Sequence, residues 1–342
     1  MRISHDRLGS LLKARKRTWL ITGVAGFIGS NLLERLLATD QQVVGLDNFA
    51  TGQLSNLEDV KKNVSKQQWE NFKFIEGDIR SFEDCCKGLE GVDHVLHHAA
   101  LGSVPRSLKK PLETHEVNVT GFLNLLLASN TVHLQSFIYA SSSSVYGDAE
   151  GAQRHEPVLG KQLSPYAATK RANELYAEMF SSRCNHKVIG LRYFNVFGPR
   201  QDAKGEYSAV IPKWIDLMLN GKNILIHGDG ETSRDFCHVE NVVQANILAS
   251  LNNELVRSYV FNVAMNFQTS LFELYLIIKK HLESYGIHYD LLPVKVGFRE
   301  GDIRHSLANI DRIKSELEFD PKVSVEAGLQ STLSWYIGNV RS

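Results

Sequence analysis

Short apolar runs alternate with longer amphipathic stretches from residue 18 to about residue 195, and this alternation constrains the fold more than any other feature. The apolar runs are bounded mostly by Gly, Asp or Ser, which is typical of buried strands. In the stretches between them apolar residues return every three or four positions, as on helices. Expected strands cover 19–22, 43–46, 72–75, 94–97, 136–139 and 188–191. Expected helices include 27–38, 113–129 and 166–182. This order predicts an α/β fold with a doubly wound parallel sheet of the Rossmann type.

After residue 196 the alternation of apolar runs and amphipathic stretches gives way to shorter segments, which are separated by turn signals at Gly198, Gly221 and 228–230. We therefore predict a helical extension over 1–17 and a dinucleotide-binding domain over 18–196. The sheet of this domain is open to completion by later segments of the chain. A smaller C-terminal substrate-binding lobe is predicted over 197–342. Because no Pro/Ser-rich linker separates the two larger parts, they should share an interface, with ligands in the cleft between them.

The charge balance is neutral, with 38 Lys and Arg against 38 Asp and Glu, so no long-range field draws the chain to nucleic acid or to a membrane. No apolar run suits a signal peptide or approaches the ~20 residues that cross a bilayer. We expect a cytoplasmic protein. Leu8, Leu11 and Leu12 recur at helical spacing before a basic cluster, which we interpret as a solvated helix and not as a membrane anchor, since its apolar face is short.

A glycine-rich turn follows the first expected strand directly. Gly23, Gly26 and Gly29 form a GxxGxxG pattern, and Phe27 and Ile28 open the helix behind it. Glycine permits a tight turn and close approach of backbone N–H groups to a pyrophosphate, while the helix N-terminus supplies partial positive charge. A turn built only for packing is the alternative for an isolated match.

Acidic residues stand at the ends of the second and third expected strands. Asp47, with Asn48 beside it, lies near the ~20-residue offset at which a carboxylate binds ribose hydroxyls. Such a carboxylate repels a 2′-phosphate, so NAD is predicted over NADP. Asp78 and Ile79 are predicted to receive the adenine edge. Helix capping by Asp78 is the alternative.

The fourth expected strand ends in His97, His98, Ala99 and Ala100. Neighbouring side chains on a strand point to opposite faces, so the two imidazoles do not converge on one ion. The four cysteines include no CxxC pair, and we predict no metal site. Ala99 and Ala100 are predicted to let a cofactor lie close to the strand ends.

A serine-rich segment at 141–144 follows the fifth expected strand, and Tyr166 and Lys170 open the next helix. Four residues apart on a helix, Tyr166 and Lys170 share one face. An adjacent ammonium and a positive nicotinamide ring both favour the phenolate, so Tyr166 is the predicted base. A lone Tyr-x-x-x-Lys also suits an ordinary amphipathic helix, but here it follows the glycine turn, the acid and the serines in order. Ser142 and Ser143 complete the predicted catalytic set.

With these motifs the chain resembles the extended short-chain dehydrogenase/reductases. Among them it is most similar to the UDP-hexose 4-epimerases that prefer N-acetylhexosamines, the group of the UDP-N-acetylglucosamine 4-epimerases. The resemblance spans nearly the whole chain and rests on 23–29, 99–100, Ser142 four residues before Tyr146, Tyr166 with Lys170, 192–198, 228–230 and 234–239.

The resemblance implies roles for single residues and an overall reaction. Ser142 would share the proton with Tyr166, Lys170 would hold the nicotinamide ribose, and Tyr193 would pack near the nicotinamide. The implied reaction is reversible 4-epimerisation of a UDP-sugar through a 4-keto intermediate, with the same hydride removed and returned and NAD recycled. A homodimer is implied, with the helices at 113–129 and 166–182 as its interface.

The resemblance also implies a sugar-nucleotide site. Asn195, Arg234 and Arg299 would bind the UDP diphosphate, with a surface ion pair to Asp235 as the alternative for Arg234. Ser306 stands where enzymes limited to plain hexoses carry a bulky aromatic residue, which predicts room for an acetamido group. The other residues assigned to the substrate are Gly102, Ser103, Ser142, Ser143, Ser144, Tyr166, Ala209, Val210 and Asp302.

One departure from the family pattern is Asn241, where the family commonly has Asp, and we expect it to alter helix capping only. Two alternative functions stay open. A UDP-sugar 4,6-dehydratase would need added acid and base groups, but the positions of the dehydratases' Asp-Glu pair are Ser143 and Ser144 here. A non-catalytic nucleotide sensor would not need an activated phenol. Neutral N-acetylhexosamine and its uronic acid are not distinguished.

Overall fold

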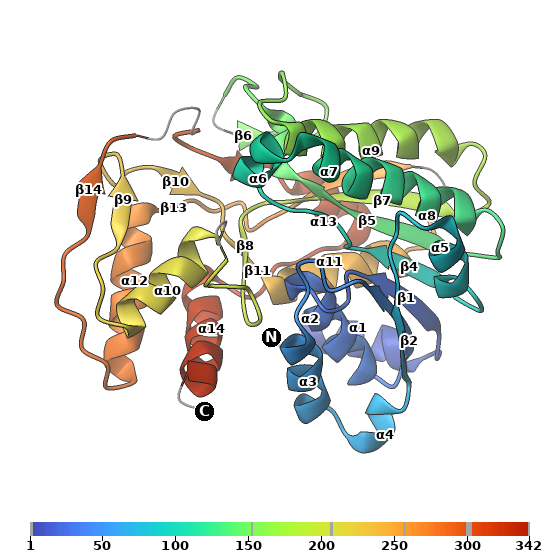
Figure 1. The fold of residues 1–342 in the computed structure, drawn as a ribbon, viewed down its shortest axis with the longest axis horizontal. Helices are drawn as coiled ribbons and strands as arrows, with labels where there is room; N and C mark the ends of the chain where they lie inside the picture. Colours follow the sequence, from blue (N-terminus) through green and yellow to red (C-terminus); the bar gives the residue numbers. More distant parts are fainter. Residues whose placement is uncertain (1–2, 152, 206–207, 256–257, 299–302, 341–342) are drawn as a thin grey trace.

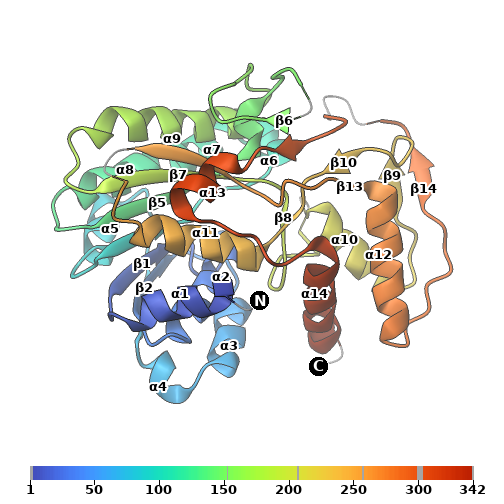
Figure 2. The ribbon, with the colours of Figure 1, turned by 180° about the vertical axis from the view of Figure 1, so that it is seen from behind.

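The computed structural model describes residues 3–151, 153–205, 208–255, 258–298 and 303–340. Its centre is a sheet of seven parallel strands with helices on both faces, and a smaller lobe lies beside it (Figures 1 and 2). From edge to edge the strands are β12 (Tyr259–Val263), β7 (Lys187–Tyr193), β5 (Ser136–Ser142), β4 (His94–His97), β1 (Thr18–Thr22), β2 (Gln42–Asp47) and β3 (Phe72–Glu76). The predicted doubly wound parallel sheet is confirmed.

All six strands expected from the sequence are present, and two of them extend toward the predicted site. β5 continues to Ser142 and β7 to Tyr193, and these two residues are register partners. Every residue of β4 and β7 is buried, as expected for strands covered on both faces. The seventh strand, β12, comes from the part of the chain after residue 196 and pairs with β7.

Two layers of helices cover the sheet. One face packs against α2 (Phe27–Leu37) and α11 (Val239–Leu251), and the other against α5 (Phe82–Gly88), α8 (Gly121–Ser129) and α9 (Pro165–Ser181). The remaining helices of these layers and their connections are α3 (Leu54–Asn63), α4 (Lys66–Trp69), α6 (Val104–Lys109) and α13 (Asp311–Leu317).

The helix expected over 113–129 is interrupted. It consists of α7 (Pro111–His115), a π-helical turn at Glu116–Thr120, and α8. Asn118 sits in the wide turn, where its Oδ1 accepts a hydrogen bond from Leu101 N (2.8 Å) and its Nδ2 donates to Thr169 Oγ1 (3.2 Å). These contacts tie the turn to α9 and to the chain after β4. The expectation of one regular helix was wrong because non-local hydrogen bonds pull this segment out of α-helical register.

The N-terminal helix α1 (Ile3–Lys13) packs on the main core. Leu8 and Leu12 are 4% and 0% exposed, so the expectation of a merely solvated helix was wrong. Leu8 and Leu12, two of the three leucines of its apolar face, are therefore covered by the protein and do not face a membrane. Within the described residues, we find no helix with both the length and the apolar character needed to cross a membrane.

The smaller lobe has its own apolar core, to which Trp214, Ile278 and Leu329 contribute. Its helices are α10 (Val210–Leu219), α12 (Leu271–Ser284) and α14 (Val325–Val340). One short strand pair joins the two parts, β6 (Gln153–Arg154) with β15 (Leu307–Ala308), and a second, β8 (Val196–Phe197) with β11 (Cys237–His238), lies where they meet. Two further pairs lie within the lobe: β9 (Leu225–His227) with β14 (Val294–Val296), and β10 (Ser233–Arg234) with β13 (Thr269–Ser270).

An ion-pair cluster fastens the two parts together. The Arg200 side chain, only 3% exposed, pairs with Glu34 on α2 and, through Nε at 2.8 Å, with Asp59 on α3. Trp335 of α14 donates from Nε1 to the same Asp59 carboxylate (3.1 Å). The lobe is therefore anchored on the helices that follow β1 and β2.

Candidate active site

A cleft of about 620 Å³ opens at the carboxyl ends of the parallel strands, where α/β sheets bind ligands. Residues at the ends of β2, β5 and β7, the turns that follow β1, β3 and β4, and residues of the smaller lobe border it. The predicted residues that line it are Gly23, Gly26, Phe27, Ile28, Gly29, Asp47, Asn48, Asp78, Ile79, Ala99, Ala100, Gly102, Ser103, Ser142, Ser143, Tyr166, Lys170, Tyr193, Asn195 and Ala209.

The glycine turn has the close contacts that its sequence predicts. Gly23 has φ +71°, a backbone conformation that residues other than glycine rarely adopt. A Cβ atom on Gly29 would lie 2.1 Å from the Gly23 carbonyl oxygen, so only glycine lets α2 approach the turn. Because α2 begins at Phe27, its N-terminal amides and the positive end of its dipole border the cleft.

Asp47 ends β2 and lies on the cleft wall, 7% exposed. Its two carboxylate oxygens accept hydrogen bonds from Ala25 N (2.9 Å) and Phe49 N (2.8 Å), which fixes the carboxylate against the glycine turn. Burial raises the pKa of Asp47, and the backbone hydrogen bonds oppose that rise. A carboxylate with two further lone-pair sites at this point suits ribose hydroxyls.

Asp78 also lines the cleft, close to Asn48, the residue that follows Asp47. It accepts a hydrogen bond from Asn48 Nδ2 (2.9 Å) and forms an ion pair with Arg80 at 2.6 Å. The Arg80 hydrogen bond lowers the pKa of Asp78. The alternative that Asp78 caps a helix is wrong, because the Ser81 side chain caps α5 by accepting from Asp84 N (3.2 Å).

His97 and His98 point to different surroundings, as the strand geometry predicts. His97 Nδ1 lies 2.7 Å from Thr22 Oγ1 in the core, whereas His98 lines the cleft with Nε2 2.9 Å from the Tyr193 hydroxyl. The His98 and Tyr193 rings stack at 6.0 Å, and Asn246 Nδ2 donates to the same hydroxyl (2.9 Å). Burial lowers the pKa of His98 to about 4, so this imidazole is neutral at physiological pH.

The predicted catalytic residues meet at the centre of the cleft. Ser142 lies at the tip of β5, and its side chain hydrogen-bonds the Tyr166 phenol. Ser164 caps α9 by accepting from Ala167 N (3.1 Å), which places Tyr166 in the first turn and Lys170 one turn later. Lys170 Nζ lies 5.9 Å from the centre of the Tyr166 ring and donates to Ala140 O (2.9 Å). The pair shares one helix face, as predicted.

The ionisation of this pair differs from the expectation in one respect. Burial lowers the pKa of Lys170 to about 8. Burial also raises the pKa of Tyr166, and the hydrogen bond from Ser142 only partly opposes it. The protein groups by themselves therefore do not favour the phenolate, contrary to the expectation for an adjacent ammonium. Further positive charge in the cleft would oppose this effect of burial on the pKa of Tyr166.

The residues assigned to the sugar nucleotide fall into three sets. Gly102, Ser103, Ser143, Asn195 and Ala209 line the cleft. Four others are not on its wall: Ser144, Val210, Arg234 and Ser306. Arg299 and Asp302 lie outside the described residues.

Two of these four residues are connected through their backbone to residues that line the cleft. Val210 follows Ala209 as the first residue of α10, and Ser144 N donates to Ser142 Oγ (3.1 Å). The other two lie together, because Ser306 N donates to the carbonyl of Ser233, the residue before Arg234 (3.3 Å).

Arg234 donates from Nη1 to the carbonyl oxygens of Ser233 (2.9 Å) and Arg304 (3.2 Å). Asp235, proposed above as its alternative ion-pair partner, is 0% exposed and accepts from the backbone N–H groups of Met265 (2.9 Å) and Ala308 (3.3 Å). The Asp235 carboxylate is thus directed into the interior and holds two loops of the lobe.

Asn241 does not act as a helix cap. His238 caps α11, and Asn241 lies in the first turn, where it exchanges hydrogen bonds with both backbone groups of Val323 (2.9 and 3.2 Å). The expected effect on capping was wrong, because the side chain anchors the segment that leads into α14.

Several cleft residues were missed by sequence reasoning. They are Leu46, residues 50–52, Gly77, Arg80, His98, Leu101, Glu113, Val117, Ala140, Ser141, Val196 and Gln201. His98 was weighed only as a metal ligand. Among the residues that the structure describes, no group of three or more His, Cys, Asp or Glu side chains is placed to hold a metal ion. Gln201 carries no motif, and it reaches the cleft because Nε2 donates to Val196 O (3.1 Å).

The cleft suits a dinucleotide from end to end. The glycine turn and the start of α2 provide a cradle for a pyrophosphate, and Asp47 stands where a ribose would lie. Ala99 and Ala100 also line the cleft, and their small side chains take up little of its space. Lys170 is the cation beside Tyr166 at the far end.

Comparison with known proteins gives a consistent result. The model of the NAD dependent epimerase/dehydratase family matches residues 19–264. The solved UDP-N-acetylglucosamine 4-epimerase from Methanobrevibacter ruminantium M1, in complex with UDP-N-acetylmuramic acid, is 36% identical with a TM-score of 0.85, covering 95% of this chain and 99% of that one. A putative UDP-glucose 4-epimerase from Methanocaldococcus jannaschii is 32% identical over 94% of this chain and 99% of its own. A dTDP-D-glucose 4,6-dehydratase from Mus musculus is 31% identical over 94% and 88%. The chain therefore belongs to the NAD-dependent epimerase/dehydratase family, and its cofactor is NAD.

Proposed function

We propose that this enzyme catalyses the reversible 4-epimerisation of a UDP-N-acetylhexosamine, either the UDP-N-acetylglucosamine/UDP-N-acetylgalactosamine pair or the corresponding uronic acids. The observation that carries the proposal is the meeting of Ser142, Tyr166 and Lys170 in the same cleft as the glycine turn. The similarity to a UDP-N-acetylglucosamine 4-epimerase supports it.

Tyr166 is the acid and base of the proposed cycle. When bound, NAD supplies a reversible hydride acceptor with a positively charged ring. The Tyr166 oxygen takes the proton of the sugar 4-hydroxyl and later returns it, while Ser142 shares that proton through its hydrogen bond. Because burial raises the pKa of Tyr166, proton removal depends on positive charge in the cleft, to which the Lys170 ammonium contributes.

The substrate side of the cleft has the small residues that the proposal requires. Gly102, Ser103 and Ala209 leave space for an acetamido group and for a 4-keto sugar that turns to present its opposite face. Asn195 on the same wall, with Arg234 and Arg299, is proposed to hold the diphosphate. Binding energy from the nucleotide would retain the intermediate while the hexose moves.

The dehydratase alternative has relatives of similar identity. Removing the carbon-5 proton and expelling the 6-hydroxyl as water require an additional base and acid. Ser143 and Ser144, on the turn that follows β5, stand where dehydratases carry their Asp-Glu pair, and an aliphatic hydroxyl acts as neither acid nor base at neutral pH. We therefore favour return of the hydride to carbon 4. A nucleotide sensor is disfavoured because the proton-transfer set is complete.

The test is NMR of the NAD-loaded enzyme with UDP-N-acetylglucosamine and, separately, with its uronic acid. Appearance of the galacto epimer from one substrate identifies the reaction and the sugar. A 4-keto-6-deoxy product would establish dehydration instead. If both nucleotide sugars stay unchanged while NAD binds, the sensor alternative holds.

Tyr166→Phe checks the mechanism in the same assay. We expect NAD binding to survive and turnover to fall by about 10³-fold or more, since the acid and base is lost. Tyr176→Phe, on the same helix, is the matched control and should turn over normally. Unchanged turnover of Tyr166→Phe would refute the proposed role.

We also propose a homodimer in the cytoplasm. The helices expected at its interface expose large apolar side chains: Leu127 is 42%, Leu175 45% and Met179 67% exposed. A second copy covering α8 and α9 would remove these side chains from water.

A further inference from the structure

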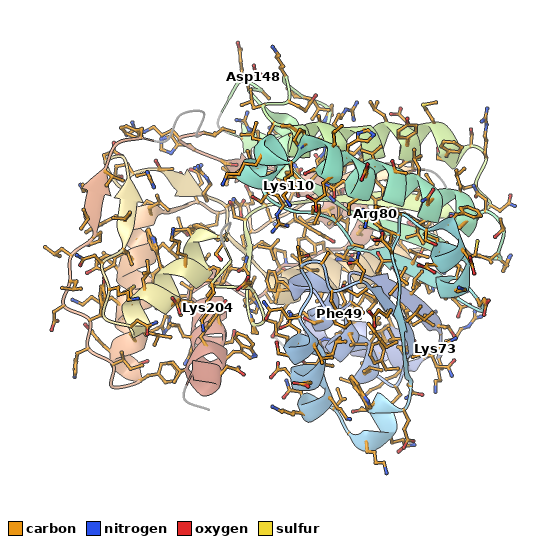
Figure 3. All side chains as sticks on the ribbon, viewed as in Figure 1. Phe49, Lys73, Arg80, Lys110, Asp148 and Lys204 are labelled. Atoms are coloured by element: carbon orange, nitrogen blue, oxygen red, sulfur yellow. The ribbon has the colours of Figure 1, made fainter. Side chains whose placement is uncertain are left out.

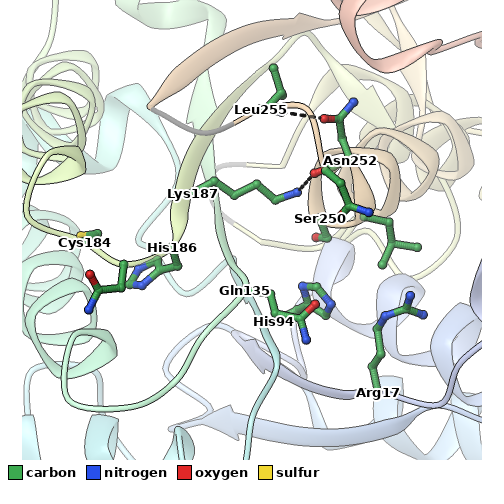
Figure 4. Close-up of a pocket in the computed structure, with 12 residues that line it drawn as sticks. Arg17, His94, Gln135, Cys184, His186, Lys187, Ser250, Asn252 and Leu255 are labelled. Atoms are coloured by element: carbon green, nitrogen blue, oxygen red, sulfur yellow. Dashed lines mark hydrogen bonds between the residues drawn. The ribbon is translucent and has the colours of Figure 1, made fainter.

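A second cavity, of about 320 Å³, lies at the amino ends of the strands (Figure 4). The active-site cleft lies at their carboxyl ends. Arg17 precedes β1, His94 begins β4, and Lys187 begins β7. Gln135, just before β5, and the end of α11 at 250–252 complete most of its wall. None of the residues just described takes part in the proposed reaction.

The lining of this cavity is basic, and no carboxylate is among its described lining residues. His94 is 1% exposed; its Nδ1 lies 2.8 Å from Ser136 Oγ, while its Nε2 is buried without a hydrogen-bond partner in the described structure. The Nε of Arg17 is likewise buried without a partner in that part of the chain. Lys187 is 8% exposed, and its ammonium donates to Asn252 O.

The positive charge at this place is only partly compensated. Burial lowers the pKa of Lys187 to about 8, and burial with the neighbouring charges of Arg17 and Lys187 lowers the pKa of His94 to about 3. The pKa of Arg17 is lowered by burial and by Arg15, and Asp93 only opposes this. The Asp93 oxygens accept from Thr18 N (2.8 Å) and Gln135 Nε2 (3.2 Å). Lys187 is buried, Arg17 is half-buried, and Arg17 Nη1 donates to the Arg15 carbonyl oxygen (2.9 Å). Because buried cations are normally paired with an anion, this arrangement favours an incoming anion.

Capping of α11 is the competing explanation. Lys187 donates to the carbonyl of Asn252, directly after the last residue of α11, where a cation complements the helix dipole. That role accounts for Lys187 alone. It does not account for the two unpartnered donors of Arg17 and His94 that border the same cavity. His186 is set apart from them, since its Nε2 lies 3.2 Å from Ser129 Oγ.

We propose that this cavity binds a small multivalent oxyanion, such as a phosphate group or a polycarboxylate, between Arg17, His94 and Lys187. The guanidinium and ammonium groups supply charge-assisted hydrogen bonds, and the neutral imidazole of His94 donates from Nε2 while Nδ1 accepts from Ser136. The amides of Gln135 and Asn252 at the wall are held by the protein, since Gln135 Nε2 donates to Asp93 Oδ1 (3.2 Å) and Asn252 Nδ2 donates to Glu316 O (3.1 Å), so the two cations and His94 carry the proposed site.

The test is isothermal titration calorimetry of the NAD-loaded enzyme with inorganic phosphate and, separately, with citrate. Saturating UDP is present so that phosphate subsites in the active-site cleft are filled. We expect one saturable site per chain. Arg17→Gln and Lys187→Gln should each weaken binding about tenfold or more, because each removes one charge-assisted contact. Lys73→Gln, on the exposed edge strand β3, is the matched control and should bind as the wild type does.

Several outcomes would overturn the proposal. Absence of saturable binding of either anion excludes the site. Binding that is unchanged in both Arg17→Gln and Lys187→Gln places the anion elsewhere. If Lys187→Gln lowers the melting temperature but Arg17→Gln has no effect on anion binding, Lys187 serves only as a cap of α11. Because the readout is binding and not turnover, the result stands apart from the fate of the proposed epimerase activity.

Discussion

Lys170→Met is expected to stabilise the cofactor-free protein while abolishing turnover. Lys170 is 4% exposed, and burial lowers its pKa from 10.5 to about 8. This difference corresponds to a penalty of about 3 kcal/mol for holding the ammonium in the folded state at pH 7. Methionine removes that penalty but leaves Ala140 O without its hydrogen bond, which costs about 1 kcal/mol. The expected net gain in the free energy of unfolding is about 1–2 kcal/mol.

The gain should depend on pH with a definite sign. The unfolded lysine keeps its proton up to about pH 10.5, whereas the folded lysine loses it above about pH 8. Between these values the unfolded state binds more protons, so the stability of the wild type rises with pH. The penalty is complete below about pH 8, and the advantage of Lys170→Met should shrink toward pH 10. Lys187 titrates in the same window but is present in both proteins, so its contribution cancels.

The measurement is urea denaturation of the NAD-free protein, followed by tryptophan fluorescence at pH 7 and pH 9.5. Lys73→Met is the control, because Lys73 lies on the edge strand β3 at the outside of the molecule (Figure 3). It should change stability little at either pH. A Lys170→Met protein that is less stable than the wild type at pH 7, or whose advantage is the same at both pH values, would refute the reasoning.

Three further predictions concern the cofactor, the lobe contact and the assembly. Asp47→Asn should weaken NAD binding about tenfold and reduce the preference for NAD over NADP, since the carboxylate that repels a 2′-phosphate is lost; fluorescence titration with both dinucleotides checks this, and an unchanged preference contradicts it. Arg200→Met leaves the carboxylates of Glu34 and Asp59 unpaired and should cost about 3 kcal/mol in urea denaturation, and a cost below about 1 kcal/mol would count against a structural role. Leu175→Arg should convert the proposed dimer to a monomer in light scattering after size exclusion, whereas Leu291→Arg in the other lobe should not; a Leu175→Arg dimer argues against this interface.

The fold could be predicted where the determinants are local. Six strands of the sheet followed from apolar runs between turn residues, and the glycine turn identified the start of α2. Completion of the sheet by a later segment was anticipated, but β12 was not identified as that segment, because its pairing with β7 joins residues about 70 positions apart and no alternation of strands and helices surrounds it. Long-range pairing of this kind leaves little trace in a short sequence window.

The helix interrupted at Glu116–Thr120 also depends on contacts with distant parts of the chain, in this case contacts of a side chain. Periodicity alone predicts a regular helix over 113–129. The π-helical turn arises from the hydrogen bonds of Asn118 to Leu101 and Thr169, which lie in other elements. The buried face of α1 was underestimated for a related reason, because spacing reveals an apolar stripe but not the surface that covers it.

Site residues divide in a similar way. Those within motifs, such as Asp47 and Tyr166, could be identified from spacing, because strand ends and helix turns place neighbouring residues together. Arg80 and Gln201 reach the cleft only through loops whose course no pattern specifies. The basic cavity at the amino ends of the strands joins four separate strand starts, so it becomes visible only when the sheet is assembled.

For Tyr166 and Lys170, the sequence predicts the position of the side chains better than their ionisation. Helical spacing predicted their shared face correctly, but the sign of the phenol pKa shift depends on burial, which spacing does not reveal. Burial raises the pKa of Tyr166 and lowers the pKa of Lys170 to about 8, so it favours the neutral phenol and weakens the affinity of Lys170 for its proton. A bound cationic ring favours the phenolate, and bound hydroxyls and phosphates favour the ammonium. Proton abstraction should therefore become efficient only once the cleft is filled, which confines the chemistry to the loaded enzyme.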